Sequence, residues 1–135
     1  MSQLHPYLTF NNCCREAMNF YKDILGGELS FIVVGESPIA DQMPPQYKDA
    51  ILHSELKAPN FTIMASDMSP QAIVDGNATH LCLVCDTPED IRSLYDKLAA
   101  GGNASQPIHE MFFGLIGSLT DKYGKSWVLQ WGKEQ

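Results

Sequence analysis

Apolar residues recur with helical spacing in two stretches of the chain that lie 74 positions apart. In each stretch they occupy positions i, i+3, i+4, i+7 and i+8, which form one face of a helix of about three to four turns. A double glycine, at 26–27 and at 101–102, follows each stretch, where a helix often ends in a left-handed residue. The pattern predicts two equivalent helices and therefore a duplicated unit. The two sets are Ala17, Phe20, Tyr21, Ile24 and Leu25, and Ile91, Leu94, Tyr95, Leu98 and Ala99.

Strand-like segments surround the two predicted helices in the same order. One segment precedes each helix and three follow it, so each unit reads β-α-β-β-β. The chain is therefore expected to be one α+β domain, residues 1–135, with unit one at 1–66, a linker at 67–78 and unit two at 79–135. We place the strands at 5–10, 28–34, 50–56 and 61–66, and at 80–85, 104–108, 112–120 and 126–131.

Local signals mark the helix starts and one long loop. An asparagine, Asn11 or Asn12, is expected to cap the first helix at 13–25, and Thr87 followed by Pro88 starts the second helix. Residues 35–49 contain three prolines and show no periodicity. Such a segment is typical of a long mobile loop with a functional role, for example a lid.

Composition narrows the class of partner. A formal net charge of −7, with basic residues scattered singly, argues against nucleic acid and anionic membranes as partners. No apolar run approaches the roughly 18 residues of a membrane span, and the polar start does not read as a signal peptide. We expect a cytoplasmic protein that handles a small molecule. Two tryptophans and six phenylalanines in a small domain favour a homodimer.

The four cysteines allow two readings. Cys82 and Cys85 spell C-x-x-C, but they lie in a strand-like run, where positions three apart point to opposite faces and cannot converge on a metal. Cys13 and Cys14 lie at a predicted helix start, where the pKa of a thiol can fall, so one of them is a candidate reactive thiol. The alternative is that the cysteines are small buried or half-buried side chains in a reducing compartment.

Several motifs, in order along nearly the whole chain, carry a family resemblance. They include Pro-Tyr-Leu-Thr-Phe at 6–10, Leu-Gly-Gly-Glu-Leu at 25–29, His-Ser-Glu-Leu at 53–56, Met-Ala-Ser-Asp at 64–67 and Leu-Thr-Asp-Lys-Tyr-Gly-Lys-Ser-Trp at 119–127. With the doubled β-α-β-β-β order, the chain resembles the vicinal oxygen chelate superfamily (glyoxalase I, extradiol dioxygenases, bleomycin and fosfomycin resistance proteins) and, within it, the PhnB-like group. That resemblance implies a cupped, mostly antiparallel eight-stranded sheet with the helices outside. The concave side of such a sheet often holds a divalent metal that chelates substrate oxygens.

The resemblance also implies an incomplete set of metal ligands. It places His5, Glu55 and His80 at ligand positions, which suit Zn, Mn, Ni or Fe. The fourth carboxylate is absent, because its position falls on Val128, and Gln130 two residues later is a weak ligand. The group's Glu-Thr-Phe-Trp-Gly run appears at 110–114 with Phe113 in place of the tryptophan, as a cavity wall.

Strand alternation adds the remaining site candidates. It places Ile51, His53 and Glu55 on one face, and His53 and Glu55 are the candidate catalytic residues, since they can share a proton or orient a ligand. A structural hydrogen-bonded pair is the alternative. The expected pocket-lining residues are Tyr7, Thr9, His53, Glu55, Cys82, Phe113 and Gln130.

Two functions follow from these residues. The missing carboxylate favours a protein that binds a small apolar or oxygenated molecule in the sheet cavity without a complete metal site. The alternative is a metal-dependent enzyme, a lyase or oxygenase of the glyoxalase or dioxygenase type. No S-adenosylmethionine motif is visible, so a methyltransferase activity has no support in the residues.

Overall fold

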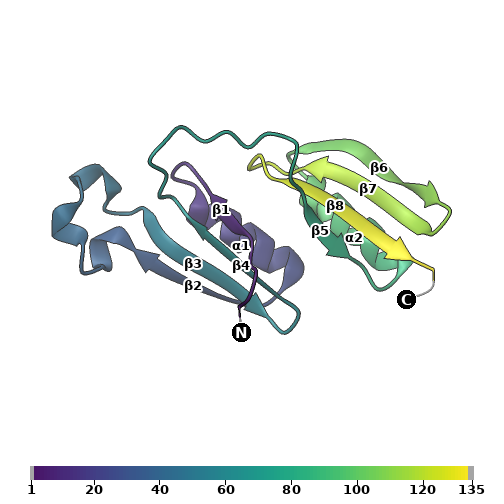
Figure 1. Cartoon of the computed structure of the whole chain (residues 1–135), viewed down its shortest axis with the longest axis horizontal. Helices are drawn as coiled ribbons and strands as arrows, with labels where there is room; N and C mark the ends of the chain where they lie inside the picture. The colour runs from purple at the N-terminus through teal and green to yellow at the C-terminus, as the bar shows by residue number, and fades with distance from the viewer. Residues whose placement is uncertain (1, 134–135) are drawn as a thin grey trace. The chain divides into compact units, whose positions relative to one another are not determined.

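The computed structural model describes residues 2–133, which form two compact units, Met1–Ile73 and Val74–Gln135 (Figure 1). The boundary between the units falls inside the stretch that the sequence assigns to a linker. Each unit has the predicted order β-α-β-β-β, which confirms a duplicated α+β fold. No helix within residues 2–133 has the length and hydropathy needed to span a membrane.

The first unit holds a four-stranded mixed sheet in the order β1-β4-β3-β2. Strand β1 runs parallel to β4, and the other neighbours are antiparallel. The first strand of the chain thus pairs with the last strand of its unit. The elements are β1 (Tyr7–Thr9), α1 (Cys14–Leu25), β2 (Glu28–Val33), β3 (Ile51–Ala58) and β4 (Phe61–Ser66).

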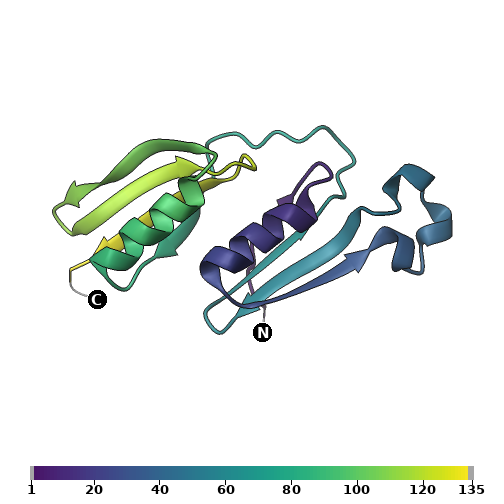
Figure 2. The ribbon, with the colours of Figure 1, turned by 180° about the vertical axis from the view of Figure 1, so that it is seen from behind.

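The second unit repeats this arrangement in the order β5-β8-β7-β6, with β5 parallel to β8. The eight strands therefore form two four-stranded sheets rather than one continuous sheet. Seen from behind, each helix lies in front of its own sheet (Figure 2). The elements are β5 (Leu81–Val84), α2 (Pro88–Ala99), β6 (Asn103–Met111), β7 (Gly114–Thr120) and β8 (Ser126–Gly132).

Helix α1 buries its apolar stripe against one face of the first sheet. Ala17 and Tyr21 are fully buried, as are Leu56 of β3 and Ala65 of β4. The helix start differs from the prediction, because neither Asn11 nor Asn12 caps it. The residue at the cap position is Cys13, without a side-chain cap bond, and the carboxylate of Asp67 accepts the N–H of Cys14 at 3.0 Å instead.

Helix α2 begins as the sequence predicts. The hydroxyl oxygen of Thr87 accepts the backbone N–H of Asp90 at 3.0 Å, and Pro88 occupies the first turn. Ile91, Tyr95 and Leu98 are buried on the face turned to the second sheet.

A buried carboxylate organises the turn between β7 and β8. Asp121, only 3% exposed, accepts the backbone N–H groups of Tyr123 at 2.8 Å and Lys125 at 3.1 Å. Its second oxygen accepts the indole N–H of Trp127 at 2.8 Å. Gly124 has φ +89°, and a Cβ at this position would lie 2.7 Å from a carboxylate oxygen of Asp75. The motif at 119–127 therefore has a structural role, because its residues hold the turn between β7 and β8.

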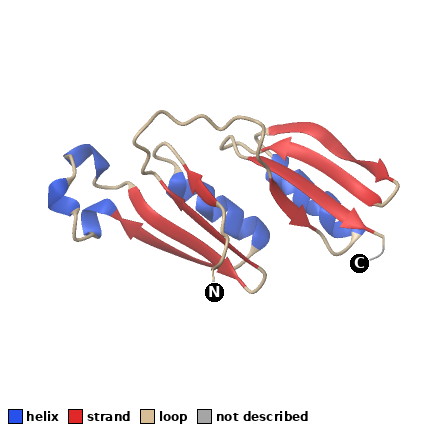
Figure 3. Ribbon diagram, in the orientation of Figure 1, coloured by secondary structure: helices blue, strands red, loops and turns tan. Residues whose placement is uncertain are grey.

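Two segments differ from the predicted elements. Residues 35–49 are not a structureless loop, because this region contains three short 3₁₀ turns (Figure 3) and its ends are joined by a hydrogen bond from the Gly35 N–H to the Lys48 carbonyl at 2.8 Å. Strand β6 is longer than predicted, and Phe112 and Phe113 form the turn after it. The turn ends at Gly114, where a Cβ would lie 2.0 Å from the carbonyl oxygen of Trp131. The 3₁₀ turns are Val34–Glu36, Ala40–Gln42 and Pro45–Tyr47.

Cys14 and Cys85 are small buried side chains, as in the second of the two readings. Cys14 is fully buried with its sulfur 3.4 Å from the Ser54 hydroxyl, and burial raises the pKa of its thiol to about 12. Burial, with smaller contributions from Asp90 and Asp86, raises the pKa of Cys85 to about 11. Cys82 is exposed while Cys85 is buried, so the C-x-x-C pair points to opposite faces. Cys14 is therefore not an activated thiol.

We predict that alkylation with iodoacetamide at pH 8 modifies Cys82 well before Cys14 and Cys85. A thiol with a pKa near 12 is a thiolate in only about one molecule in ten thousand at this pH, and the thiolate is the reactive form. Peptide mapping by mass spectrometry over time measures the order, and protein unfolded in guanidinium is the control in which the difference disappears. Equal rates for Cys14 and Cys82 in the folded protein would contradict this assignment.

We also predict that Asp121→Asn lowers the free energy of unfolding by about 1–3 kcal/mol. The amide has one oxygen, so either the turn amides or the Trp127 N–H loses its acceptor in a buried site. Urea unfolding followed by circular dichroism measures the change. Asp96→Asn on the exposed side of α2 is the matched control and should change the stability by less than about 0.5 kcal/mol. A loss no larger than in this control would argue against the role of Asp121.

Candidate functional site

Each sheet has one face under its helix and one face turned away from it, which we call its open face. Strand register and alternation identify the residues of the first open face, because paired residues on neighbouring strands point the same way. Tyr7 pairs with Met64, Met64 pairs with Glu55, and Glu55 pairs with Ser30. The first open face comprises Tyr7, Thr9, Glu28, Ser30, Ile32, His53, Glu55, Lys57, Thr62, Met64 and Ser66.

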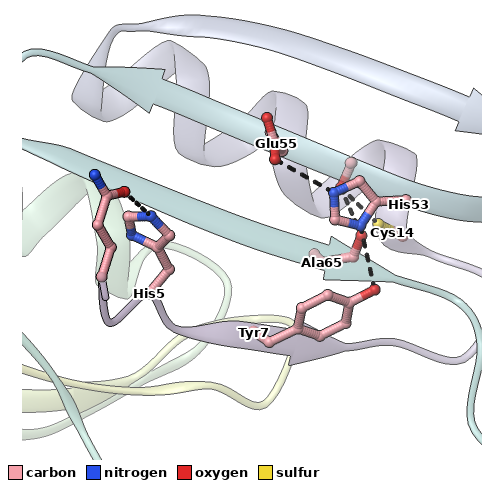
Figure 4. Close-up of polar contacts among 8 residues, drawn as sticks. His5, Tyr7, Cys14, His53, Glu55 and Ala65 are labelled. Atoms are coloured by element: carbon pink, nitrogen blue, oxygen red, sulfur yellow. Dashed lines mark hydrogen bonds and ion pairs between the residues drawn. The ribbon is translucent and has the colours of Figure 1, made fainter. Parts of the chain in front are cut away.

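Three polar side chains on this face contact one another. The hydroxyl of Tyr7 lies 3.4 Å from Nδ1 of His53, and Nε2 of His53 lies 3.5 Å from a carboxylate oxygen of Glu55 (Figure 4). The rings of Tyr7 and His53 are 5.8 Å apart between centroids. Because β4 lies between β1 and β3, the tyrosine reaches across one strand to meet the histidine. We call these three residues the polar row.

The polar row is half-buried, and apolar side chains border it. Tyr7 is 51% exposed, and the side chains of His53 and Glu55 are 32% and 34% exposed. Ile32, the cross-strand partner of His53, is 48% exposed. The face therefore combines hydrogen-bonding groups with uncovered apolar surface.

One predicted member of this face is misplaced. The sequence puts Ile51 on the same face as His53 and Glu55, but Ile51 is 1% exposed. The register between β2 and β3 shifts between Ile32 and Val33, which leaves one extra residue in β3. This bulge turns Ile51 to the helix side, because two successive residues of a bulge oppose one residue of the partner strand.

The residues that the resemblance implies as metal ligands lie in different surroundings. His5 precedes β1, and its Nε2 lies 3.0 Å from the side-chain oxygen of Gln3 (Figure 4). Glu55 belongs to the polar row, and His80 is exposed directly before β5 in the second unit. Within residues 2–133, no three His, Cys, Asp or Glu side chains are grouped so that they would hold a metal ion.

The strand register also changes which positions of the two units correspond. Val128 of β8 pairs with Cys82 of β5. The corresponding pair in the first unit is Met64 of β4 with Tyr7 of β1. Glu55 lies on β3, and its counterpart on β7 is Ser118, the partner of Val128. Glu55 and Val128 are thus not equivalent positions, although the sequence treated both as the carboxylate position.

The second open face has a different chemistry. Its residues include Cys82 and Val84 of β5, and Val128 and Gln130 of β8. Partial burial raises the pKa of the Cys82 thiol above its usual value. The positions that correspond to Tyr7, His53 and Glu55 hold Cys82, Ile116 and Ser118. Across the two open faces, the linked tyrosine, histidine and carboxylate occur in the first unit alone.

Phe113 lies in a turn and not in a strand of the second sheet. It belongs to the turn between β6 and β7, where its ring meets that of Phe112 edge to face at 5.3 Å. The resemblance implies a cavity wall at this position, and the structure places Phe113 in the turn directly before β7.

A hollow in the first unit was missed from the sequence. It has a volume of about 280 Å³ and lies between the last 3₁₀ turns and the segment after β4. Its residues come from two segments that are 20 positions apart in the sequence, and neither segment has a periodicity that would single it out. The lining residues are Met43, Tyr47, Asp67, Met68, Ser69 and Pro70.

The family model described as 3-demethylubiquinone-9 3-methyltransferase matches residues 2–130. Protein YjdN of Escherichia coli (strain K12) is 32% identical over 142 aligned positions, covering 98% of this chain and 97% of YjdN. The crystal structure of protein PA1353 from Pseudomonas aeruginosa is 32% identical, with a TM-score of 0.87 and 98% of each chain covered.

Two further solved structures have the same fold as this chain. The PhnB protein from Bacillus cereus is 26% identical with a TM-score of 0.77, covering 97% of this chain and all of that one. A glyoxylase/bleomycin resistance protein/dioxygenase domain from Frankia sp. EAN1pec shares the fold at 18% identity and a TM-score of 0.67, covering 98% of this chain and 99% of that one. The chain therefore belongs to the PhnB-like family, the one whose model is described as 3-demethylubiquinone-9 3-methyltransferase, and it shares its fold with the glyoxylase/bleomycin resistance protein/dioxygenase domain.

Proposed function

We propose that this protein binds a small apolar or oxygenated molecule on the first open face, without a complete set of protein metal ligands. The observation that carries the proposal is the polar row of Tyr7, His53 and Glu55, whose members contact one another beside uncovered apolar side chains. Small-molecule sites commonly combine an apolar lining with a few placed polar groups.

The arrangement of the row supports a binding role more than a purely structural one. Each member of the row keeps about a third or more of its surface exposed, so the three contacts do not satisfy buried groups of the core. A structural pair would instead resemble Asp121 and Trp127, both nearly buried and 2.8 Å apart. The helix side of the same sheet supplies the packing that stabilises the unit.

The proposal keeps two further expectations from the sequence, a homodimer and a cytoplasmic location. Support for the dimer comes from exposed apolar residues of the second unit: Phe112 is 92% exposed and Met111 is 43% exposed. Apolar side chains grouped at the end of a hairpin are typical of surfaces that another chain covers.

We expect the neutral apolar dye Nile red to bind the folded protein with increased fluorescence. Ile32→Gln should weaken this binding about three- to tenfold, because the change removes apolar surface beside the polar row. Val74→Gln, at an exposed apolar residue outside both open faces, is the matched control and should leave the dye affinity unchanged. Absence of dye binding would contradict the proposed function, and equal effects of the two variants would contradict its placement.

The metal-dependent alternative makes a separate prediction. Under the proposal, calorimetric titration with Zn²⁺, Mn²⁺ or Ni²⁺ should show no stoichiometric site of micromolar or tighter affinity, since fewer anionic ligands weaken a site. A tight site that is lost in both His5→Ala and Glu55→Ala would establish the metal-dependent alternative instead. Glu28→Ala, an exposed acidic residue on β2, is the control.

A further inference from the structure

The hydrogen-bonding order within the polar row points to the class of ligand. We propose that Tyr7, His53 and Glu55 together present acceptors, so that the face selects a neutral or cationic molecule with a hydroxyl or N–H group next to an apolar body. This inference rests on the proposed function and specifies the ligand of the same face.

The carboxylate of Glu55 determines which ring nitrogen of His53 carries a hydrogen. A carboxylate only accepts hydrogen bonds, so the contact at 3.5 Å requires His53 to carry a hydrogen on Nε2. In the neutral form of His53, to which this inference applies, the imidazole has one N–H, so Nδ1 is left as an acceptor. Glu55 therefore acts as a positioning residue that selects the tautomer of His53.

The tautomer of His53 in turn determines the direction in which the Tyr7 hydroxyl donates its hydrogen. Since Nδ1 accepts, the phenol donates its only hydrogen along the 3.4 Å contact. The Tyr7 oxygen can then form further hydrogen bonds only as an acceptor, through its lone pairs. Glu55 has a second oxygen that also accepts. A ligand that meets the row thus meets acceptors, and it has to supply the donors.

The charges around the row agree with this class of ligand. On β3, Lys57 lies two residues beyond Glu55, but its cross-strand partner on β2 is the acidic Glu28. The neighbouring open-face residues of β4, Thr62 and Met64, are uncharged. With a formal net charge of −7 on the chain, an anionic ligand would meet Glu55 and a repulsive field.

The contact distances leave room for a ligand to complete the row. The 3.4 Å contact of the Tyr7 hydroxyl is longer than the roughly 2.7–2.8 Å typical of hydroxyl donors, and the 3.5 Å contact of the His53 N–H is longer than the roughly 2.9–3.0 Å typical of N–H donors. Such bonds often shorten when a ligand binds. Ile32 and Met64 lie on the same face beside the row, where they would contact the apolar body of the ligand.

Three matched probes test the inference on the full-length protein: benzyl alcohol with a hydroxyl donor, benzyl methyl ether with an acceptor only, and benzoate with a negative charge. Their dissociation constants are measured by NMR titration. We expect benzyl alcohol to bind about five- to tenfold more tightly than the ether, as the loss of one hydrogen bond implies, and benzoate to bind most weakly.

Two variants assign the preference to the row. Tyr7→Phe keeps the ring and removes one acceptor, so it should reduce the preference for the alcohol over the ether without removing it, because Nδ1 of His53 and the second oxygen of Glu55 still accept. Glu55→Gln should shift the preference toward the ether and benzoate, because the amide can donate to Nε2 of His53, which turns Nδ1–H toward Tyr7 and frees the phenol hydrogen for the ligand. A merely structural role of Glu55 would weaken all probes alike.

Thr62→Val, which removes a hydroxyl from the same open face outside the row, is the matched control and should retain the preference. Equal affinities for alcohol and ether, or tighter binding of benzoate, would overturn this inference while leaving the proposed function intact. Binding of none of the three probes would overturn both. Circular dichroism confirms that each variant is folded before the titration.

Discussion

One helix covers each four-stranded sheet, and this constraint governs both units. A single helix can bury only one sheet face, so the alternate residues of every strand remain on the other side. In the first unit the helix side takes Leu56, Ile63 and Ala65, whereas Tyr7, His53 and Glu55 lie on the open face. Stability and recognition thus use different residues of the same strands. A substitution on the open face can change binding without removing the contacts that hold the unit together.

Two carboxylates, the half-buried Asp67 and the buried Asp121, join segments that the sheet alone would leave unconnected. Asp67 accepts one N–H at the start of α1 and, at 2.9 Å, the N–H of Ile51 at the start of β3. Asp121 ties the β7–β8 turn to the indole of Trp127. Both residues lie in motifs that carry the family resemblance, and in both cases the hydrogen bonds explain the residue type. These parts of the family pattern therefore report on the fold, and the polar row is where we look for function.

The two units share a backbone plan but differ on their open faces. The parallel strand, the helix and the antiparallel strands recur in the same order, because these features depend on apolar periodicity and turn residues. The residues of the open faces do not pack against the helices, so their types are not constrained by this periodicity. Tyr7, His53 and Glu55 correspond to Cys82, Ile116 and Ser118. One repeat thus carries the hydrogen-bonding groups, while the other presents small and apolar side chains at the same positions.

The sequence by itself determined the duplicated β-α-β-β-β order, both helices and the opposite orientations of Cys82 and Cys85, because periodicity is read locally along the chain. It also paired His53 with Glu55, which are two residues apart on one strand. Tertiary structure decided the rest of the site. The contact of Tyr7 with His53 spans 46 positions and exists because β1 pairs beside β4. The bulge that buries Ile51 and the capping of α1 by Asp67 likewise depend on which strands become neighbours. No local pattern contains that information, because pairing depends on the packing of the whole unit.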